Sequence, residues 1–101
     1  MSFIEDKLLL WRMRRGDAEA LGSIYEKYRK TVVSVAVVML GDRGAAEDVL
    51  HDVFVRFAER APELELKTSL KGYLMTAVVN AVRSRYRQAA SPTVGLDELN
   101  L

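Results

Sequence analysis

The stretch AAEDVLHDVFVRF, residues 45–57, spaces its apolar side chains three and four positions apart, as one face of an α-helix requires. That apolar row consists of Ala46, Val49, Leu50, Val53, Phe54 and Phe57. The opposite side is polar, and it carries Glu47, Asp48, His51 and Asp52. The stretch therefore predicts an amphipathic helix that packs one row into a core and exposes an acidic face.

The sequence before this stretch predicts a long helix over residues 18–40, with Asp17 as its N-cap and Gly41 as its C-cap. Its expected core-facing stripe is Leu21, Ile24, Tyr28, Val32, Val35 and Met39. Its second half is also apolar away from that stripe, at Val33, Val37 and Val38. A helix that is apolar nearly all round is typical of the central position in a bundle.

Helix-breaking and helix-capping residues also mark the ends of the other helices. Asp42 is the expected cap of a helix over residues 44–61, which ends at Pro62, and Ser69 is the expected cap of a last helix that reaches residue 89. The inward positions of that last helix are Leu70, Tyr73, Leu74, Ala77, Val78, Ala81 and Val82. A short helix over residues 4–15 comes first, and we expect Trp11 to anchor it by packing. The expected fold is an all-α bundle of three main helices plus a short N-terminal helix.

Composition narrows the class of protein. Half of the 101 residues are hydrophobic and none is cysteine, which excludes a disulfide framework, a cysteine zinc site and a cysteine nucleophile. The N-terminal sequence lacks the pattern of a signal peptide, and the most apolar stretch, residues 32–40, is about half the length that spans a bilayer. We expect a cytoplasmic protein with no membrane contact.

Charge is divided unevenly along the chain, although the formal net charge is only +1. Residues 42–65 hold seven acids against three arginines, whereas residues 67–88 hold five cations and no acid. The five cations are Lys67, Lys71, Arg83, Arg85 and Arg87. This asymmetry predicts two faces with two different partners.

The polar face of residues 45–57 has several other interpretations. Glu47 and His51 share a helix face, but a zinc site needs three or four ligands and this is the only histidine. Catalysis would need a second partner for His51, and no serine or threonine lies at a suggestive spacing. A solvated face explains acids in the first turns, but not His51 and Asp52 in mid-helix. We expect neither an enzyme nor a bound cofactor.

Two segments resemble a known family. IYEKYRKTVVSVAVVMLGDRGAAEDVLHDVFVRF, residues 24–57, followed by SLKGYLMTAVVNAVRSRYRQ, residues 69–88, resembles region 2 of bacterial RNA polymerase sigma factors, above all the extracytoplasmic-function (ECF) group. The block A-E-D followed by D-V-F is the more specific part. The resemblance implies a transcription-initiation factor, with residues 1–90 as its region 2 domain. It also implies that residues 91–101 begin a linker towards a helix-turn-helix domain that is missing from this sequence.

In that family, the helix with the A-E-D block docks on the clamp coiled coil of the polymerase β′ subunit. Carried over by position, the docking residues are Asp48, His51, Asp52 and Val55. His51 stands where the family usually has glutamine; both donate and accept hydrogen bonds, and a histidine can make docking sensitive to pH near neutrality. An exposed acidic strip beside apolar residues suits a basic partner.

The resemblance also implies that the last helix and the preceding loop bind the minus-ten promoter element as a single non-template strand with one base flipped out. The residues it assigns to DNA are Lys67, Ser69, Lys71, Tyr73, Asn80, Arg83 and Arg87. The cations can pair with phosphates, Tyr73 can stack on a base, and Asn80 can hydrogen-bond a base edge. Two alternatives stay open, a core position for Tyr73 and a surface or structural amide for Asn80.

Departures from the family pattern predict weak promoter contacts. Tyr73 replaces the usual tryptophan, Thr76 and Val79 stand where many members have arginine or another polar residue, and the loop ELELKTS lacks the usual arginine and aromatic. The alternative function is therefore a sigma-like interaction module that binds polymerase, or an anti-sigma factor, without melting the promoter.

Overall fold

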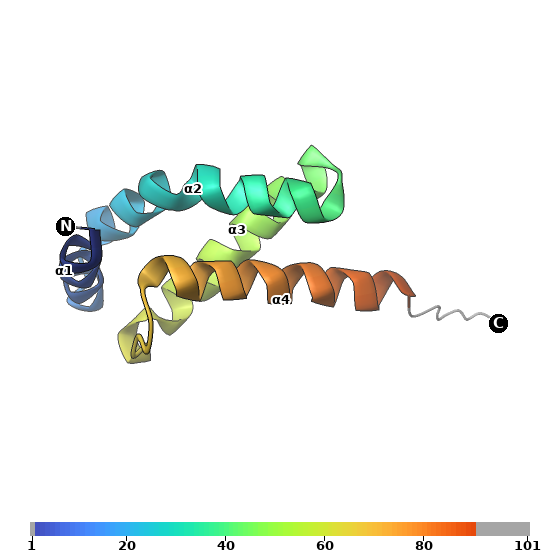
Figure 1. The fold of residues 1–101 in the computed structure, drawn as a ribbon. Helices are drawn as coiled ribbons and strands as arrows, with labels where there is room; N and C mark the ends of the chain where they lie inside the picture. Colours follow the sequence, from blue (N-terminus) through green and yellow to red (C-terminus); the bar gives the residue numbers. More distant parts are fainter. Residues whose placement is uncertain (1, 91–101) are drawn as a thin grey trace.

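The computed structural model describes residues 2–90, which fold into four α-helices and one 3₁₀ turn and contain no strand (Figure 1). The elements are α1 (Ser2–Arg14), α2 (Ala18–Leu40), α3 (Arg43–Arg60), η1 (Ala61–Glu63) and α4 (Leu70–Ala90). The predicted all-α bundle of three main helices and a shorter leading one is confirmed. The expected linker, residues 91–101, lies outside the described part.

Side-chain and glycine caps set the helix ends, as the sequence predicts. The three N-caps Asp17, Asp42 and Ser69 accept hydrogen bonds from the backbone N–H groups of Glu19, Gly44 and Gly72 at 3.0, 2.8 and 3.0 Å. Gly41 ends α2 with a left-handed φ of 68°, and its N–H donates to the Val37 carbonyl at 2.7 Å. A β-carbon disfavours that backbone conformation, so glycine suits the position.

The hydrophobic core lies where α2, α3 and α4 meet, with α3 running obliquely behind the other two in Figure 1. The most deeply buried large side chains are Ile24, Val32, Phe57, Leu70, Leu74, Val78 and Val82. Every member of the apolar row in residues 45–57 is buried. That row therefore fixes the rotation of α3 about its axis and leaves its polar side facing outward.

The buried stripe of α2 differs from the predicted one at several positions. It repeats every four residues as Ala20, Ile24, Tyr28, Val32 and Ala36, whereas the predicted members Leu21, Val35 and Met39 are only partly buried. The helix is central, because it contacts each of the other three. It is not covered all round, however: Val38 is 85% exposed, since α1 packs against the N-terminal part of α2.

A buried carboxylate joins α1 to α2. Asp6 is only 3% exposed; its carboxylate accepts hydrogen bonds from the Tyr28 hydroxyl and from Lys27 Nζ, the latter at 2.6 Å. Lys27 Nζ also donates to Glu5 at 2.5 Å. Partial desolvation lowers the pKa of Lys27, but the hydrogen bonds to Asp6 and Glu5 outweigh it and raise that pKa above its ordinary value. These hydrogen bonds and ion pairs hold α1 against α2.

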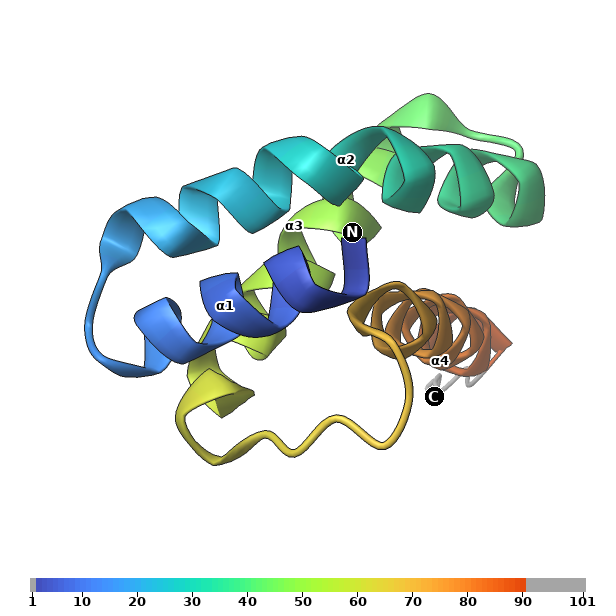
Figure 2. The same cartoon turned by 60° about the vertical axis from the view of Figure 1, so that its left-hand side comes forward.

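The opposite end of α1 lies near the connection from α3 to α4. Figure 2 shows this connection running past α1, and Arg14 Nε donates to the Ala61 carbonyl of η1 at 3.1 Å. The expectation that Trp11 anchors α1 is wrong: its side chain is 53% exposed, and Leu9 and Leu10 are buried instead. Successive helix residues turn by about 100°, so Trp11 points away from the core when those leucines face it.

Within residues 2–90, no helix combines the length and the apolar character that crossing a membrane requires.

Candidate functional site

The outward side of α3 carries the four residues assigned to polymerase docking. Asp48, His51, Asp52 and Val55 lie at positions i, i+3, i+4 and i+7, which place them on one side of a helix. The side chains of Asp48 and Asp52 are 71% and 49% exposed, Val55 is 41% exposed, and His51 is also exposed. We call these four residues the α3 face. The structure brings them together on an accessible surface.

The two aspartates of the α3 face have arginine neighbours within the protein. Asp52 Oδ2 lies 3.2 Å from Arg56 Nε, one turn along α3. Asp48 Oδ2 lies 3.8 Å from Arg85 Nη2 on α4. Exposed ion pairs of this kind contribute at most about 1 kcal/mol, so a partner's cations can replace them at small cost. The acidic and basic segments of the sequence thus meet at one edge instead of forming wholly separate faces.

A groove runs between α3 and α4, and we call it the α3–α4 groove. Its charged residues are Asp48, Asp52, Arg56, Arg60, Arg85 and Arg87. Its uncharged polar residues from α4 are Tyr73, Thr76, Asn80, Ser84 and Gln88. Four arginines against two aspartates make the lining basic, and hydroxyl and amide groups lie between them. Such a lining can pair with phosphates and hydrogen-bond the edge of a base.

The structure tests the alternative roles of Tyr73 as a core residue and of Asn80 as a surface or structural amide. Tyr73 is half-buried: its ring centre lies 6.0 Å from that of Phe57, while the residue also lines the α3–α4 groove. It is therefore both a packing residue and a groove residue. Asn80 is exposed, and its amide has no hydrogen-bond partner among the described residues. A structural hydrogen bond therefore does not account for Asn80, whereas the alternative of a surface amide fits its exposed position.

The other residues assigned to DNA do not converge on this groove. Lys67 lies beside α1, in a hollow that it shares with Lys7 and Glu65. Ser69 caps α4, and Lys71 and Arg83 are exposed on α4 outside the groove. The α3–α4 groove gathers three of the seven predicted residues: Tyr73, Asn80 and Arg87.

Residues 24–91, more than half of the chain, match the family model for sigma-70 region 2. The chain belongs to the sigma-70 region 2 family. The match spans α3 and α4, and with them the α3 face and the α3–α4 groove. Neither the curated proteins nor the solved structures gave a match. Membership makes this a domain of sigma factors, which bind core RNA polymerase and recognise promoters and are not enzymes.

Sequence reasoning missed two arginines of this sigma region 2 domain. Arg56 and Arg60 lie in the acidic segment, so their charge was counted against the acids around them. The structure turns both towards α4, where they line the groove. Their spacing of four and eight residues from Asp52 places all three near one side of α3, which was a usable indication.

The metal hypothesis finds no geometric support in the sigma region 2 domain. Glu47, one of its two candidate ligands, accepts a hydrogen bond from Arg43 Nε at 3.1 Å. Among the described residues, no three histidine or acidic side chains gather closely enough to hold a metal ion.

Proposed function

We propose that this domain is of the ECF type, that its α3 face docks on the clamp coiled coil of the polymerase β′ subunit, and that α4 holds the minus-ten element as a single strand. One observation carries the proposal. The exposed α3 face shares Asp48, His51 and Asp52 with the edge of a groove lined by four arginines, on the two helices that the family match spans. One surface suits a basic protein partner and the other suits nucleic acid.

The α3 face has the chemistry that a basic coiled coil needs. Val55 offers an apolar contact, and His51 offers a hydrogen-bonding ring at the position where the family usually has glutamine. Asp48 and Asp52 exchange their weak internal pairs for pairs with lysine or arginine of the partner. Partial burial of those new pairs at the interface would make them stronger than the exposed ones they replace.

The α4 helix supplies the proposed nucleic-acid contacts. Tyr73 has part of its ring free to stack on an unpaired base, and the Asn80 amide is available for a base edge. Arg87 in the groove, with Arg83 and Lys71 along the helix, can pair with phosphates. Lys67 and Ser69, in and after the preceding loop, would contact the same strand at the N-terminal end of α4.

Calorimetry with the isolated β′ clamp coiled coil tests the docking half. We expect binding by the wild type and its loss in Asp48→Lys, which places a cation opposite the partner's cations. Glu63→Lys is the matched control, because Glu63 is an exposed acid of η1 outside the α3 face. Equal affinity of wild type and Asp48→Lys would refute docking through this face.

Titration with a fluorescent single-stranded minus-ten oligonucleotide and a scrambled oligonucleotide tests the DNA half. We expect a sequence preference that falls with salt, and that Asn80→Ala reduces. Lys30→Ala is the control, since Lys30 is an exposed cation of α2 that lies outside the groove.

A second candidate function is an interaction module that binds polymerase or an anti-sigma factor and does not melt DNA. The packing of Tyr73 on Phe57 favours it, because a half-buried ring leaves less surface for stacking. Binding to the coiled coil without any sequence preference for the oligonucleotide would select this alternative.

A further inference from the structure

A hollow lies between α1 and the connection from α3 to α4, and we call it the α1 hollow. Figure 2 shows this connection passing along α1 before it enters α4. Trp11 and Arg14 of α1 form one side of the hollow, and Glu65 and Lys67 of the connection form the other. Its volume of about 420 Å³ lies within the roughly 300–1,000 Å³ of small-ligand sites, so a group the size of one nucleotide fits.

The α1 hollow combines an apolar lining with an exposed aromatic ring. Leu10, which is buried, and Leu66, which is half-buried, both line it. Trp11 is 53% exposed and is the single tryptophan of the chain. Aromatic side chains are stacking platforms for unpaired bases, and this stacking tolerates any base because each has a π-face. An exposed tryptophan in a hollow of this size therefore suits a base.

Cations lie on both sides of the α1 hollow. Lys7, Arg14 and Lys67 line it against one acid, Glu65. Both lysines are exposed and have no acid partner among residues 2–90. The lining is therefore positive, and its lysines are available to pair with phosphates.

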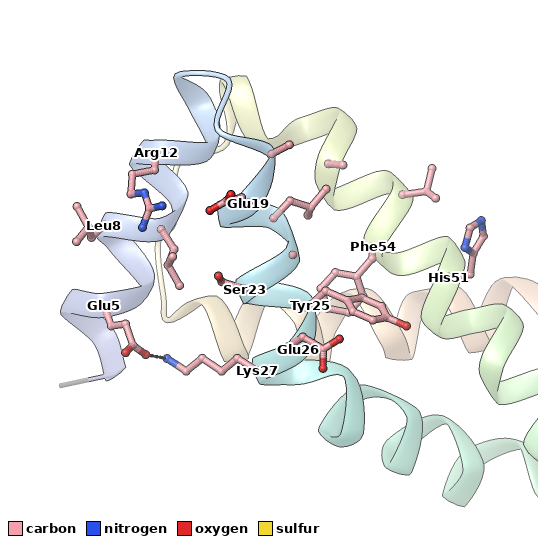
Figure 3. Close-up of a pocket in the computed structure, with 16 residues that line it drawn as sticks. Glu5, Leu8, Arg12, Glu19, Ser23, Tyr25, Glu26, Lys27, His51 and Phe54 are labelled. Carbon is pink, nitrogen blue, oxygen red and sulfur yellow. Dashed lines mark hydrogen bonds and ion pairs between the residues drawn. The ribbon is translucent and has the colours of Figure 1, made fainter.

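The acids of α1 lie outside the α1 hollow. Glu5 and Asp6 bind Lys27 of α2, and Figure 3 shows Glu5 directed to that lysine. The charge of the hollow is therefore not neutralised by its own helix. Arg15, just after α1, adds to it, because its guanidinium lies 5.0 Å from the centre of the Trp11 ring. An anionic strand that approaches Trp11 is attracted by these cations.

The position of the α1 hollow extends the path proposed for the strand. Tyr73 lines the α3–α4 groove, whereas Lys67, also assigned to DNA, lies outside that groove and in the hollow. Six residues separate the two, so their Cα atoms are at most about 22 Å apart. A strand that leaves the groove at the N-terminal end of α4 can therefore pass Ser69 and reach the hollow.

We propose that the α1 hollow binds one nucleotide of a single strand, with its base stacked on Trp11 and its phosphates paired with Lys7 and Lys67. This role of Trp11 rests on the proposed function, because α4 would bring the strand to the hollow. The helix α1 precedes the residues that match the family, so the match itself gives no role to Trp11 or Lys7. The leading helix is thereby a second contact with nucleic acid.

Fluorescence of Trp11 tests this site directly in the 101-residue chain. The probe is an oligothymidylate of about 12 nucleotides, because stacking on an aromatic ring does not require a particular base. We expect its binding to quench the emission of Trp11, and thymidine monophosphate at the same nucleotide concentration to leave the emission unchanged. Equal quenching by the monophosphate would mean that the ligand is a free nucleotide, and would overturn a strand as the occupant.

Substitution of the ring measures the contribution of stacking. Trp11→Leu should weaken binding of a labelled oligothymidylate, followed by anisotropy, by at least about fivefold, and Trp11→Tyr should lose less. Leucine favours helix and the ring lies largely at the surface, so Trp11→Leu keeps the fold. Phe3→Leu is the matched control, since Phe3 is 50% exposed on the same helix but lies outside the hollow. It should bind as the wild type does.

Substitution of the charges tests the phosphate contacts. Glu65→Gln removes the acid of the hollow and should tighten binding of oligothymidylate. Lys7→Gln should weaken binding and make its salt dependence shallower by about one phosphate contact. Lys30→Gln removes an exposed cation of α2 outside the hollow and controls for total charge. Equal effects of Lys7→Gln and Lys30→Gln would overturn the pairing of Lys7 with the strand.

The α1 hollow and the α3–α4 groove can fail separately. Unchanged Trp11 emission with the strand bound, or wild-type affinity of Trp11→Leu, would overturn the hollow and leave the groove standing. Quenching of Trp11 without any preference for the minus-ten oligonucleotide would support the hollow and overturn base recognition by the groove. If neither oligonucleotide binds, both proposals are overturned.

Discussion

Arg85 of α4 reaches across the α3–α4 groove to Asp48 of α3, with Nη2 lying 3.8 Å from Oδ2. One ion pair thus links the surface proposed to bind polymerase with the groove proposed to bind DNA. A basic partner at Asp48 would replace Arg85 and leave its guanidinium available for a phosphate. An exposed pair contributes at most about 1 kcal/mol, so this link can couple the two binding events by no more than about fivefold.

The first prediction concerns this competition. Arg85→Gln removes the cation that pairs with Asp48, so the affinity of the domain for the β′ coiled coil should rise by up to about fivefold. The same variant should bind the minus-ten oligonucleotide less tightly and with a shallower salt dependence, because one phosphate contact is gone. Calorimetry and anisotropy measure the two effects.

The control for Arg85 is Arg43→Gln, because Arg43 also pairs with an acid of α3 but lies outside the α3–α4 groove. It should leave both affinities near those of the wild type. Weaker docking by Arg85→Gln would show that Arg85 contacts the coiled coil itself and does not compete with it.

The second prediction concerns the attachment of α1. Asp6→Ala leaves the Tyr28 hydroxyl and Lys27 without their buried acceptor, and should lower the free energy of unfolding by about 2–3 kcal/mol. Trp11 is the single tryptophan and belongs to α1, so its fluorescence reports on this helix. In urea, the fluorescence transition of Asp6→Ala should precede the loss of helical circular dichroism.

Glu5→Gln is the matched control for Asp6, since the Glu5 carboxylate is 61% exposed and bonds the same lysine. It should cost less than about 1 kcal/mol. Coincident wild-type-like transitions for Asp6→Ala would mean that the buried carboxylate does not hold α1 in place.

A third prediction follows from the raised pKa of Lys27. Because folding raises this pKa, the stabilisation is complete below the unfolded value of about 10.4 and is lost as pH rises above it. Lys27→Arg replaces the ammonium with a guanidinium that stays charged over this range. The unfolding free energy of the wild type should therefore fall more steeply between about pH 10 and 12 than that of Lys27→Arg. Parallel pH profiles would show that the bonds to Asp6 and Glu5 do not stabilise the charged form.

The features that the sequence predicted are local ones. The caps Asp17, Asp42 and Ser69 act on N–H groups two or three residues away, and the apolar row of α3 follows from helical periodicity alone. The same periodicity placed the members of the α3 face on one side before any contact was known. The role of that face in docking stays a prediction.

What the sequence could not predict depends on how the helices cross. The bond from Tyr28 to Asp6 spans 22 residues and requires α1 to fold back on α2. The spacing of Arg56 from Asp52 indicates the side of α3 on which it stands, but whether that side faces solvent or a groove is decided by where α4 lies. The predicted stripe of α2 did not include Ala20 and Ala36, because alanine is a weak signal in a hydrophobic pattern. Both are buried, since their small size allows the helices to pack closely.

A fourth prediction separates two roles of Ser69. Ser69→Ala removes the oxygen that accepts from the Gly72 N–H, and should lower the free energy of unfolding by about 1 kcal/mol. Ser69→Asp retains the cap but adds a negative charge at the start of α4. In urea it should therefore unfold like the wild type, while its affinity for the minus-ten oligonucleotide should fall. Wild-type oligonucleotide binding by Ser69→Asp would restrict this residue to capping.

The last prediction addresses whether Tyr73 stacks on DNA as well as on Phe57. Tyr73→Phe keeps the ring, and oligonucleotide affinity should stay close to that of the wild type. Tyr73→Leu keeps apolar volume beside Phe57 but loses the aromatic plane, which should cost about 1–3 kcal/mol of binding, or roughly 5- to 150-fold. Urea unfolding of both variants establishes how much of any loss comes from the core. A folded Tyr73→Leu that binds the oligonucleotide as the wild type does would make Tyr73 a packing residue only, and would shift the proposal towards the interaction module that does not melt DNA.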